Sequence, residues 1–144
     1  MAKDWDFLAL QTAKMETNLY AIQDDFNNIS INVNTTNLVI VATDEDTATV
    51  ECLEQEKVKH TVQVKDDTLC IDVVDSRKWY EYIGVSFQSP KVTIYVPQKQ
   101  YAAVHVSVST ADVQIENFTA NYLELALSTG DMRLTDVQIG RAHV

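Results

Sequence analysis

The fold is decided by residues 104–115, which read Val104-His105-Val106-Ser107-Val108-Ser109-Thr110-Ala111-Asp112-Val113-Gln114-Ile115. Apolar and polar residues alternate along both arms of this stretch, which is the pattern of a β-strand with one buried face. The polar residues between the arms have short side chains that hydrogen-bond a turning backbone. The stretch therefore predicts a strand, a corner and a second strand.

The same unit occurs three times. Residues 123–134 repeat it 19 positions later without a gap, and residues 29–40 carry it 75 positions earlier. One copy alone buries too little apolar surface to offset the entropy of ordering it, so the copies are expected to stack. The third corner position holds Thr36, Ala111 or Gly130 and is therefore expected not to need a positive φ. The corner residues to which we assign a structural role are Asn34, Thr35, Asn37, Ser109, Thr110, Asp112, Ser128, Thr129, Gly130 and Asp131.

The rest of the chain extends the same pattern. From Ile29 onward, short alternating runs rich in Val, Ile and Thr are separated by polar breaks, and no apolar stripe has helical spacing. This predicts an all-β protein. Residues 1–25 differ and are interpreted as a lead-in segment with an early strand at about 18–22, with a helical turn before it as one alternative.

Composition excludes several classes of function. The 144 residues carry a formal net charge of −10, with a pI near 4.5. Proteins that bind nucleic acid or anionic lipid need clustered Lys and Arg, so neither partner is expected. No apolar run is long enough to span a membrane, and the first residues lack the apolar region of a signal peptide.

Several motifs resemble the DUF4097 family of bacterial putative adhesins. They are the run Ser-Pro-Lys-Val-Thr-Ile-Tyr-Val-Pro at 89–97, the Ser-Thr-Ala-Asp and Ser-Thr-Gly-Asp corners, Lys57-Val58-Lys59-His60, Asp67-Thr68-Leu69-Cys70-Ile71 and Arg77-Lys78-Trp79-Tyr80. The resemblance covers about residues 15–138 and points to the Gram-positive branch. It implies a right-handed β-solenoid or β-roll outside the membrane, behind an N-terminal membrane anchor. It implies no enzymatic activity and no catalytic residues.

The chain ends suggest a fragment of a longer protein. The final residues Ile139-Gly140-Arg141-Ala142-His143-Val144 break the sequence repeat, and one DNA sequence that encodes them with a stop codon resembles a common sequencing adapter. The alternative is a genuine terminus. We expect a juxtamembrane-like lead-in at 1–25, a C-terminally incomplete DUF4097-like domain at 26–138 and a non-native tail at 139–144. Met1 is then an internal start, and the open end of the solenoid is a surface for self-association.

Histidines, cysteines and carboxylates give weak signals. His60, His105 and His143 lack partners at metal-ligand or catalytic spacing and are expected to be solvated. Cys52 falls on an inward position and Cys70 on the opposite face of its strand, so a disulfide is not expected. Stacked Asp112 and Asp131 could bind Ca²⁺ or form a glycosidase pair, but two carboxylates are few for Ca²⁺, and corner capping is favoured.

The only aromatic cluster is Trp79, Tyr80 and Tyr82, with Phe87 nearby, and its three leading members are the candidate ligand contacts. The alternative is that these rings cover the edge of the sheet. Together these features predict a non-catalytic extracytoplasmic module that binds an unknown protein or glycan at the cell surface, or serves the cell envelope. No catalytic residue, cofactor or metal site is expected. The alternative is a polysaccharide-processing enzyme built on a β-helix.

Overall fold

The computed structural model describes residues 15–55, 57–75 and 89–143. These residues form strands and no helix, which confirms the prediction of an all-β protein, and none of them forms a helix that could span a membrane. The strands are β1 (Met15–Ile22), β2 (Asn28–Val33), β3 (Asn37–Thr43), β4 (Ala48–Gln55), β5 (Val58–Lys65), β6 (Thr68–Asp75), β7 (Lys91–Pro97), β8 (Gln100–Thr110), β9 (Val113–Thr129) and β10 (Met132–His143). The early strand is present as β1, whereas a helical turn before it would fall outside the described residues.

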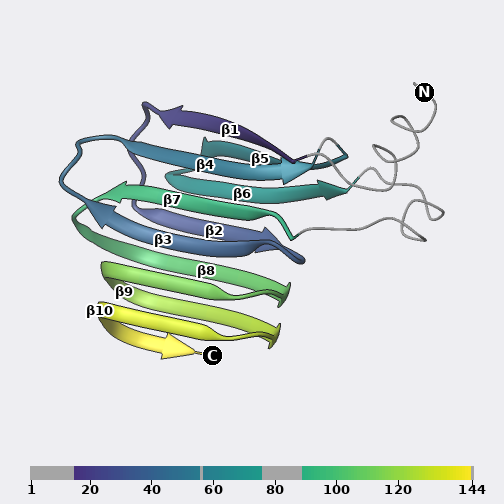
Figure 1. Ribbon diagram of the computed structural model, residues 1–144. Coiled ribbons are helices and arrows are strands. Elements are labelled where there is room, and N and C mark those ends of the chain that lie inside the picture. Colours follow the sequence, from purple (N-terminus) through teal and green to yellow (C-terminus); the bar gives the residue numbers. More distant parts are fainter. Residues whose placement is uncertain (1–14, 56, 76–88, 144) are drawn as a thin grey trace, which may run out of the picture.

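The three repeat copies stack in parallel, as their sequences predict. Val104 of β8 pairs with Leu123 of β9, and Val113 of β9 pairs with Met132 of β10, so both steps keep the 19-residue offset. Ile29 of β2 pairs with Val104 at the 75-residue offset. Figure 1 shows this stack, with β2 and β3 above β8, β9 and β10. The stacked register is therefore confirmed.

Strands β9 and β10 bend from one wall of the molecule to the other. The first part of β9 pairs with β3, and its second part pairs with β8. The bend lies at Asn117, whose φ is 53°, and β10 bends at the equivalent Asp136, whose φ is 52°. Asn and Asp are the non-glycine residues that best tolerate this left-handed conformation, which is why the chain can turn here without glycine.

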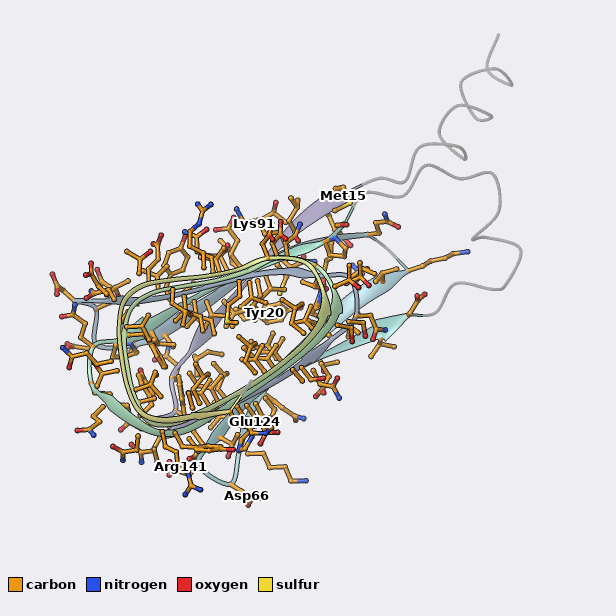
Figure 2. The ribbon with its side chains drawn as sticks, turned by 90° about the horizontal axis from the view of Figure 1, so that it is seen from below. Met15, Tyr20, Asp66, Lys91, Glu124 and Arg141 are labelled. Atoms are coloured by element: carbon orange, nitrogen blue, oxygen red, sulfur yellow. The ribbon has the colours of Figure 1, made fainter. Side chains whose placement is uncertain are left out.

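The predicted open solenoid or β-roll is wrong, because the strands close on themselves. Pairing runs in the order β4, β5, β6, β2, β8, β9, β3 and β7, and β7 then pairs antiparallel with β4. The result is a flattened, closed barrel of eight strands, with β1 attached to β4 and β10 attached to β9 outside that ring. Figure 2 shows the closed outline.

Closure depends on antiparallel hairpins that the repeat does not contain. β4, β5 and β6 follow one another as hairpin neighbours. The turn between β5 and β6 is the pair Asp66 and Asp67, both with positive φ, which is the geometry of a two-residue hairpin. Alternation of apolar residues is the same in parallel and antiparallel strands, so it identified the strands and not their direction.

The interior of the barrel is filled by apolar side chains. In the repeat at 104–115, the five residues predicted to point inward are at most 2% exposed; they are Val104, Val106, Val108, Val113 and Ile115. The rings of Phe26, Tyr101 and Phe118 stack in sequence, with centroid separations of 6.0 and 5.1 Å. Side chains fill the inside of the outline in Figure 2, so a ligand would bind at the corners, the edges or the outer walls of the barrel.

β10 continues to His143 and pairs with β9 through Ile139, Arg141, Ala142 and His143. The parallel pairing of the repeat thus extends over residues whose sequence departs from it. The interpretation of residues 139–144 as a non-native tail stays a prediction, as do the other domain limits.

Candidate functional site

The corners between walls are joined by a ladder of hydrogen bonds. The backbone N–H of Asp112 donates to Oδ1 of Asn37 at 2.9 Å, and the N–H of Asp131 donates to Oδ1 of Asp112 at 3.0 Å. Each short polar side chain therefore accepts from the backbone of the next coil. This use of Asp112 occupies an oxygen that a Ca²⁺ site or a glycosidase pair would need.

Backbone groups of the other corner residues join the same ladder. The carbonyl of Asn34 accepts from the N–H groups of Ser109 and Thr110, and the carbonyl of Thr129 accepts from Ala111. The expectation that the third corner position needs no positive φ is wrong at Gly130, where φ is 135°. A Cβ added to Gly130 would lie 1.9 Å from the carbonyl oxygen of Ala111, so the approach of the two coils requires glycine here.

The residues that the sequence singled out are not brought together at one place. The candidate contacts Trp79, Tyr80 and Tyr82 lie outside the described residues. His105 is exposed, with Nδ1 3.8 Å from Oε2 of Glu124, and His143 is exposed on β10. Cys52 is buried and Cys70 is half-buried, and both are free thiols, in agreement with the prediction for the two cysteines.

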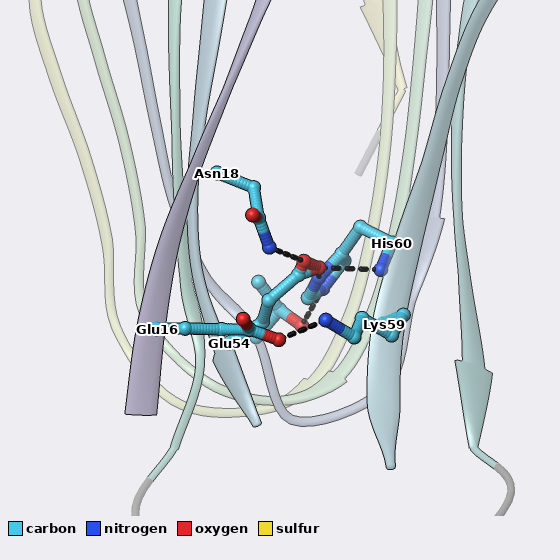
Figure 3. A network of polar contacts seen from close by, with 6 residues as sticks. Glu16, Asn18, Glu54, Lys59 and His60 are labelled. Atoms are coloured by element: carbon cyan, nitrogen blue, oxygen red, sulfur yellow. Dashed lines mark hydrogen bonds and ion pairs between the residues drawn. The ribbon is translucent and has the colours of Figure 1, made fainter. Parts of the chain in front are cut away.

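His60 was expected to be solvated, and this is wrong: its side chain is buried between the walls. It belongs to a polar cluster that Figure 3 shows inside one end of the barrel. Glu54 Oε1 accepts from the backbone N–H of His60 at 2.7 Å and lies 3.2 Å from its Nδ1. Nε2 of His60 is 2.7 Å from Oγ1 of Thr36, and Nδ2 of Asn18 donates to Oε2 of Glu54 at 3.3 Å.

Strand periodicity explains why this cluster points inward. Cys52 and Glu54 share the parity of Val50 on β4, so all three side chains face the interior. His60 likewise shares the parity of Val58 on β5. Thr36 arrives from the corner between β2 and β3. Beside the cluster, at the strand surface, the ammonium group of Lys59 pairs with the carboxylate of Glu16.

Burial controls the protonation of the cluster. Desolvation lowers the pKa of His60 below its ordinary value, although the hydrogen bond and charge of Glu54 act in the opposite direction. Desolvation, followed by the nearby charges of Glu54 and Glu51, raises the pKa of the Cys52 thiol to about 12. The imidazole and the thiol are therefore neutral at pH 7.

This arrangement permits two kinds of chemistry. Thr36, His60 and Glu54 are in the order of a hydroxyl nucleophile, a base and an orienting carboxylate. All three side chains are buried, however, and none lines either of two surface pockets in the described part of the chain, so neither pocket brings a substrate to them. The second possibility is ion binding, because Cys52, Glu54 and His60 each offer a metal-ligand atom and these three atoms lie within 4.8 Å of one another.

An open surface pocket lies at the opposite corner, where the β7–β8 turn meets the bend of β9. This corner pocket has a volume of about 300 Å³ and is lined by Ala42, Gln98, Lys99, Gln100, Asn117 and Thr119. Asn117 Nδ2 donates to the carbonyl of Ala42 at 3.3 Å, which fixes the amide at the rim. Among the described residues, the lining contains amides, a hydroxyl and one ammonium group, and no carboxylate, imidazole or thiol.

The sequence contained a signal for the buried cluster and little signal for the corner pocket. The inward parity of Glu54 and His60 could have identified two polar residues on buried positions. The residues of the corner pocket are separated by up to 77 positions in the sequence and meet only because β3 and β9 are paired.

Comparisons with solved structures support the fold. A putative cell adhesion protein from Clostridium sporogenes ATCC 15579 matches with a TM-score of 0.55 at 12% identity, over 81% of this chain and 59% of that one. A putative lipid binding protein from Parabacteroides distasonis ATCC 8503 matches with a TM-score of 0.51 at 14% identity, over 89% and 61%. This chain thus spans less than two thirds of the length of either structure. At these identities the likeness concerns the fold alone.

A comparison with curated proteins finds no match. The family model described as Toastrack DUF4097 matches residues 26–144, which include every strand from β2 onward. That range contains the corner repeat, the corner pocket and most of the buried cluster. The match spans most of the sequence, and the chain belongs to the Toastrack DUF4097 family.

Proposed function

We propose that this chain is a non-enzymatic binding module of the cell surface that recognises a glycan at the corner pocket. The observation that carries the proposal is the composition of the pocket lining: amides, a hydroxyl and one ammonium group around about 300 Å³ of open space. That volume is at the lower end of the range for small-ligand sites and suits one or two sugar rings.

The chemistry of the lining favours a neutral, polyhydroxylated ligand. The Gln98 amide offers donors and an acceptor, which matches the mixed hydrogen bonding of sugar hydroxyls. The amide nitrogens of Gln100 and Asn117 already donate to Asn121 and to the Ala42 carbonyl, and each has a second N–H that could meet a ligand. Lys99 adds a single donor, and its ammonium group also lies 3.3 Å from Oδ1 of Asn27. With one cation and a net charge of −10 on the whole chain, the pocket is poorly suited to polyanions.

The same lining argues against hydrolysis. A glycosidase needs two carboxyl groups that flank the scissile bond, and the corner pocket has none among its described residues. The predicted pair, Asp112 and Asp131, lies in the ladder at the other corner and is committed to backbone hydrogen bonds through Asp112. Binding without turnover is therefore favoured over the polysaccharide-processing alternative.

Placement at the cell surface is part of the proposal. It is supported by the adhesion name of a structure with the same fold and by the family resemblance, which implies a position outside the membrane. The aromatic residues Trp79, Tyr80 and Tyr82 remain a second proposed contact for the same ligand.

The test is a glycan array probed with the purified full chain and three variants. Gln98→Ala removes a pocket amide, Gln63→Ala removes an exposed amide on β5 as the matched control, and Trp79→Ala tests the aromatic contact. Loss of one hydrogen bond is expected to weaken binding by about 3- to 10-fold in Gln98→Ala, with no change in Gln63→Ala.

Equal binding by Gln98→Ala and wild type, with loss in Trp79→Ala, would move the site to the aromatic segment. The absence of any glycan signal would reject the glycan proposal. Release of reducing sugar ends from a bound glycan, abolished in Asp112→Asn or Asp131→Asn, would reject the non-enzymatic proposal.

A further inference from the structure

We propose that Cys52, Glu54 and His60 form a binding site for a divalent transition-metal ion, with Zn²⁺ the best match. The three ligand atoms come from β4 and β5 and lie within 4.8 Å of one another. Figure 3 shows Glu54 and His60 facing each other across the space between their strands. The site is remote from the corner pocket and does not depend on the proposed glycan binding.

The separation of two of the atoms already fits a common ion. His60 Nδ1 and Glu54 Oε1 are 3.2 Å apart. Two ligands at about 2.0–2.1 Å from one tetrahedral Zn²⁺ are separated by about 3.3 Å. The thiol of Cys52, two residues before Glu54 on the same face of β4, supplies the third atom. Three protein ligands are the number found in zinc sites that keep a fourth position for a non-protein ligand.

Further hydrogen bonds orient two of the ligand side chains, as in known metal sites. Histidine ligands usually hydrogen-bond through their second ring nitrogen, and His60 Nε2 is 2.7 Å from Oγ1 of Thr36. The second carboxylate oxygen of Glu54 accepts from Asn18 at 3.3 Å. Neither contact uses His60 Nδ1 or Glu54 Oε1, which face each other, and Oε1 also accepts from the backbone N–H of His60 at 2.7 Å.

Charge balance is compatible with a divalent ion here. The side chains of Glu54 and His60 have no exposed surface, and a buried metal site is least costly when the charges of the ion and of its ligands cancel. A Zn²⁺ ion bound by the carboxylate, the Cys52 thiolate and a neutral imidazole has no net charge. On binding, the Cys52 thiol releases one proton to solvent, and the single imidazole proton is held on Nε2, where Oγ1 of Thr36 accepts the hydrogen bond.

The donor set selects the class of metal. One sulfur, one nitrogen and one oxygen are typical ligands of Zn²⁺ and of its substitute Co²⁺. Ca²⁺ and Mg²⁺ prefer six or more oxygens, and only one carboxylate is available at this site.

The experiment uses the untagged full chain, stripped with a chelator and titrated with ZnCl₂ or CoCl₂. The chain has only two cysteines, so in the Cys70→Ala variant Cys52 is the sole thiol. We expect one ion per chain, a thiolate-to-cobalt charge-transfer band in both wild type and Cys70→Ala, and a higher thermal midpoint with Zn²⁺. Calorimetry in buffers of different ionisation enthalpy should show about one proton released per ion.

Two variants test the assignment further. Asn18→Ala, which removes a partly exposed outer contact, is expected to weaken Zn²⁺ binding by about 10- to 100-fold, and Cys52→Ala should abolish the cobalt band. The absence of a thiolate-to-cobalt band in Cys70→Ala would overturn the proposal. This result would not depend on a substitution at any of the buried ligand residues. Zn²⁺ affinity that is unchanged in both Asn18→Ala and Cys52→Ala would overturn it as well, because the ion would then be bound by surface groups.

Discussion

Tyr101 shows how one buried residue couples the core to pH. Its ring lies between those of Phe26 and Phe118, and its hydroxyl donates to the carbonyl of Pro97 at 2.7 Å. The ammonium group of Lys99 lies 5.2 Å from the ring centroid. Burial raises the pKa of Tyr101 above its ordinary value of 10.0, so the folded protein keeps the phenol protonated where the unfolded chain begins to lose the proton.

We predict that Tyr101→Phe costs about 1 kcal/mol of unfolding free energy at neutral pH, because the Pro97 carbonyl loses its donor. The folded pKa is raised, so the contribution of Tyr101 is complete below pH 10 and declines as the pH rises above it. Wild type then loses up to about 1.4 kcal/mol per pH unit from this group, and the variant does not. Urea unfolding at pH 8, 10 and 11 should show the difference in unfolding free energy between wild type and Tyr101→Phe becoming smaller as the pH rises. For the control Phe118→Leu, the difference in unfolding free energy from wild type should stay the same at each pH. The same constant difference for Tyr101→Phe would contradict the prediction.

For single residues, the sequence predicted which side chains are buried better than it predicted which polar side chains interact. Inward parity correctly placed Cys52 and the valines of the repeat. The same parity applied to His60, but a lone histidine was assigned to solvent because no partner stood at a familiar spacing. Its partners Glu54 and Thr36 come from other elements, and their proximity follows from how the strands pair.

Among the structural elements, the corners place the strictest requirements on residue type and backbone conformation. The strand–corner–strand unit and its 19-residue register were predictable, because alternation and a repeated polar corner are local signals. The special conformation of Gly130 was not, because the other copies tolerate Ala111 and Thr36 at that position. Asp66 and Asp67 form the hairpin turn that reverses the chain, and a two-residue polar break does not by itself distinguish a hairpin from a solenoid corner.

We predict that Gly130→Ala destabilises the protein by about 1–3 kcal/mol. The new methyl group would meet the carbonyl oxygen of Ala111 at 1.9 Å, on a backbone with φ of 135° that side chains rarely adopt. The β9–β10 corner must therefore open. Ala111→Gly is the matched control and should cost only about 0.4–1 kcal/mol through the entropy of the unfolded chain. Equal urea midpoints for Gly130→Ala and wild type would show that the corner adjusts freely.

For the whole molecule, closure of the barrel changes where a partner can attach. The sequence implied an open stack with an exposed C-terminal end, whereas β4–β7 pairing closes eight strands into a ring. Ring closure is a property of pairings between distant segments, which no local pattern contains. β10 nevertheless lies outside the ring, and within the described residues it pairs with β9 alone. Figure 1 shows it as the last strand of the stack.

We predict that this free edge supports concentration-dependent self-association. Met132 and Leu134 are 37% and 46% exposed on β10, and an unpaired strand offers a row of backbone donors and acceptors to a second copy. The net charge of −10 opposes contact between copies, so association should strengthen as added salt screens that repulsion.

Sedimentation at increasing protein and salt concentration measures this self-association. Leu134→Lys should weaken association, whereas Val74→Lys, at an exposed apolar residue of β6 that pairs with Lys59 of β5 and lies away from β10, should not. A monomer at every concentration and salt level would show that β10 is protected as it stands, and that apolar exposure at a strand edge is here too small to overcome charge repulsion.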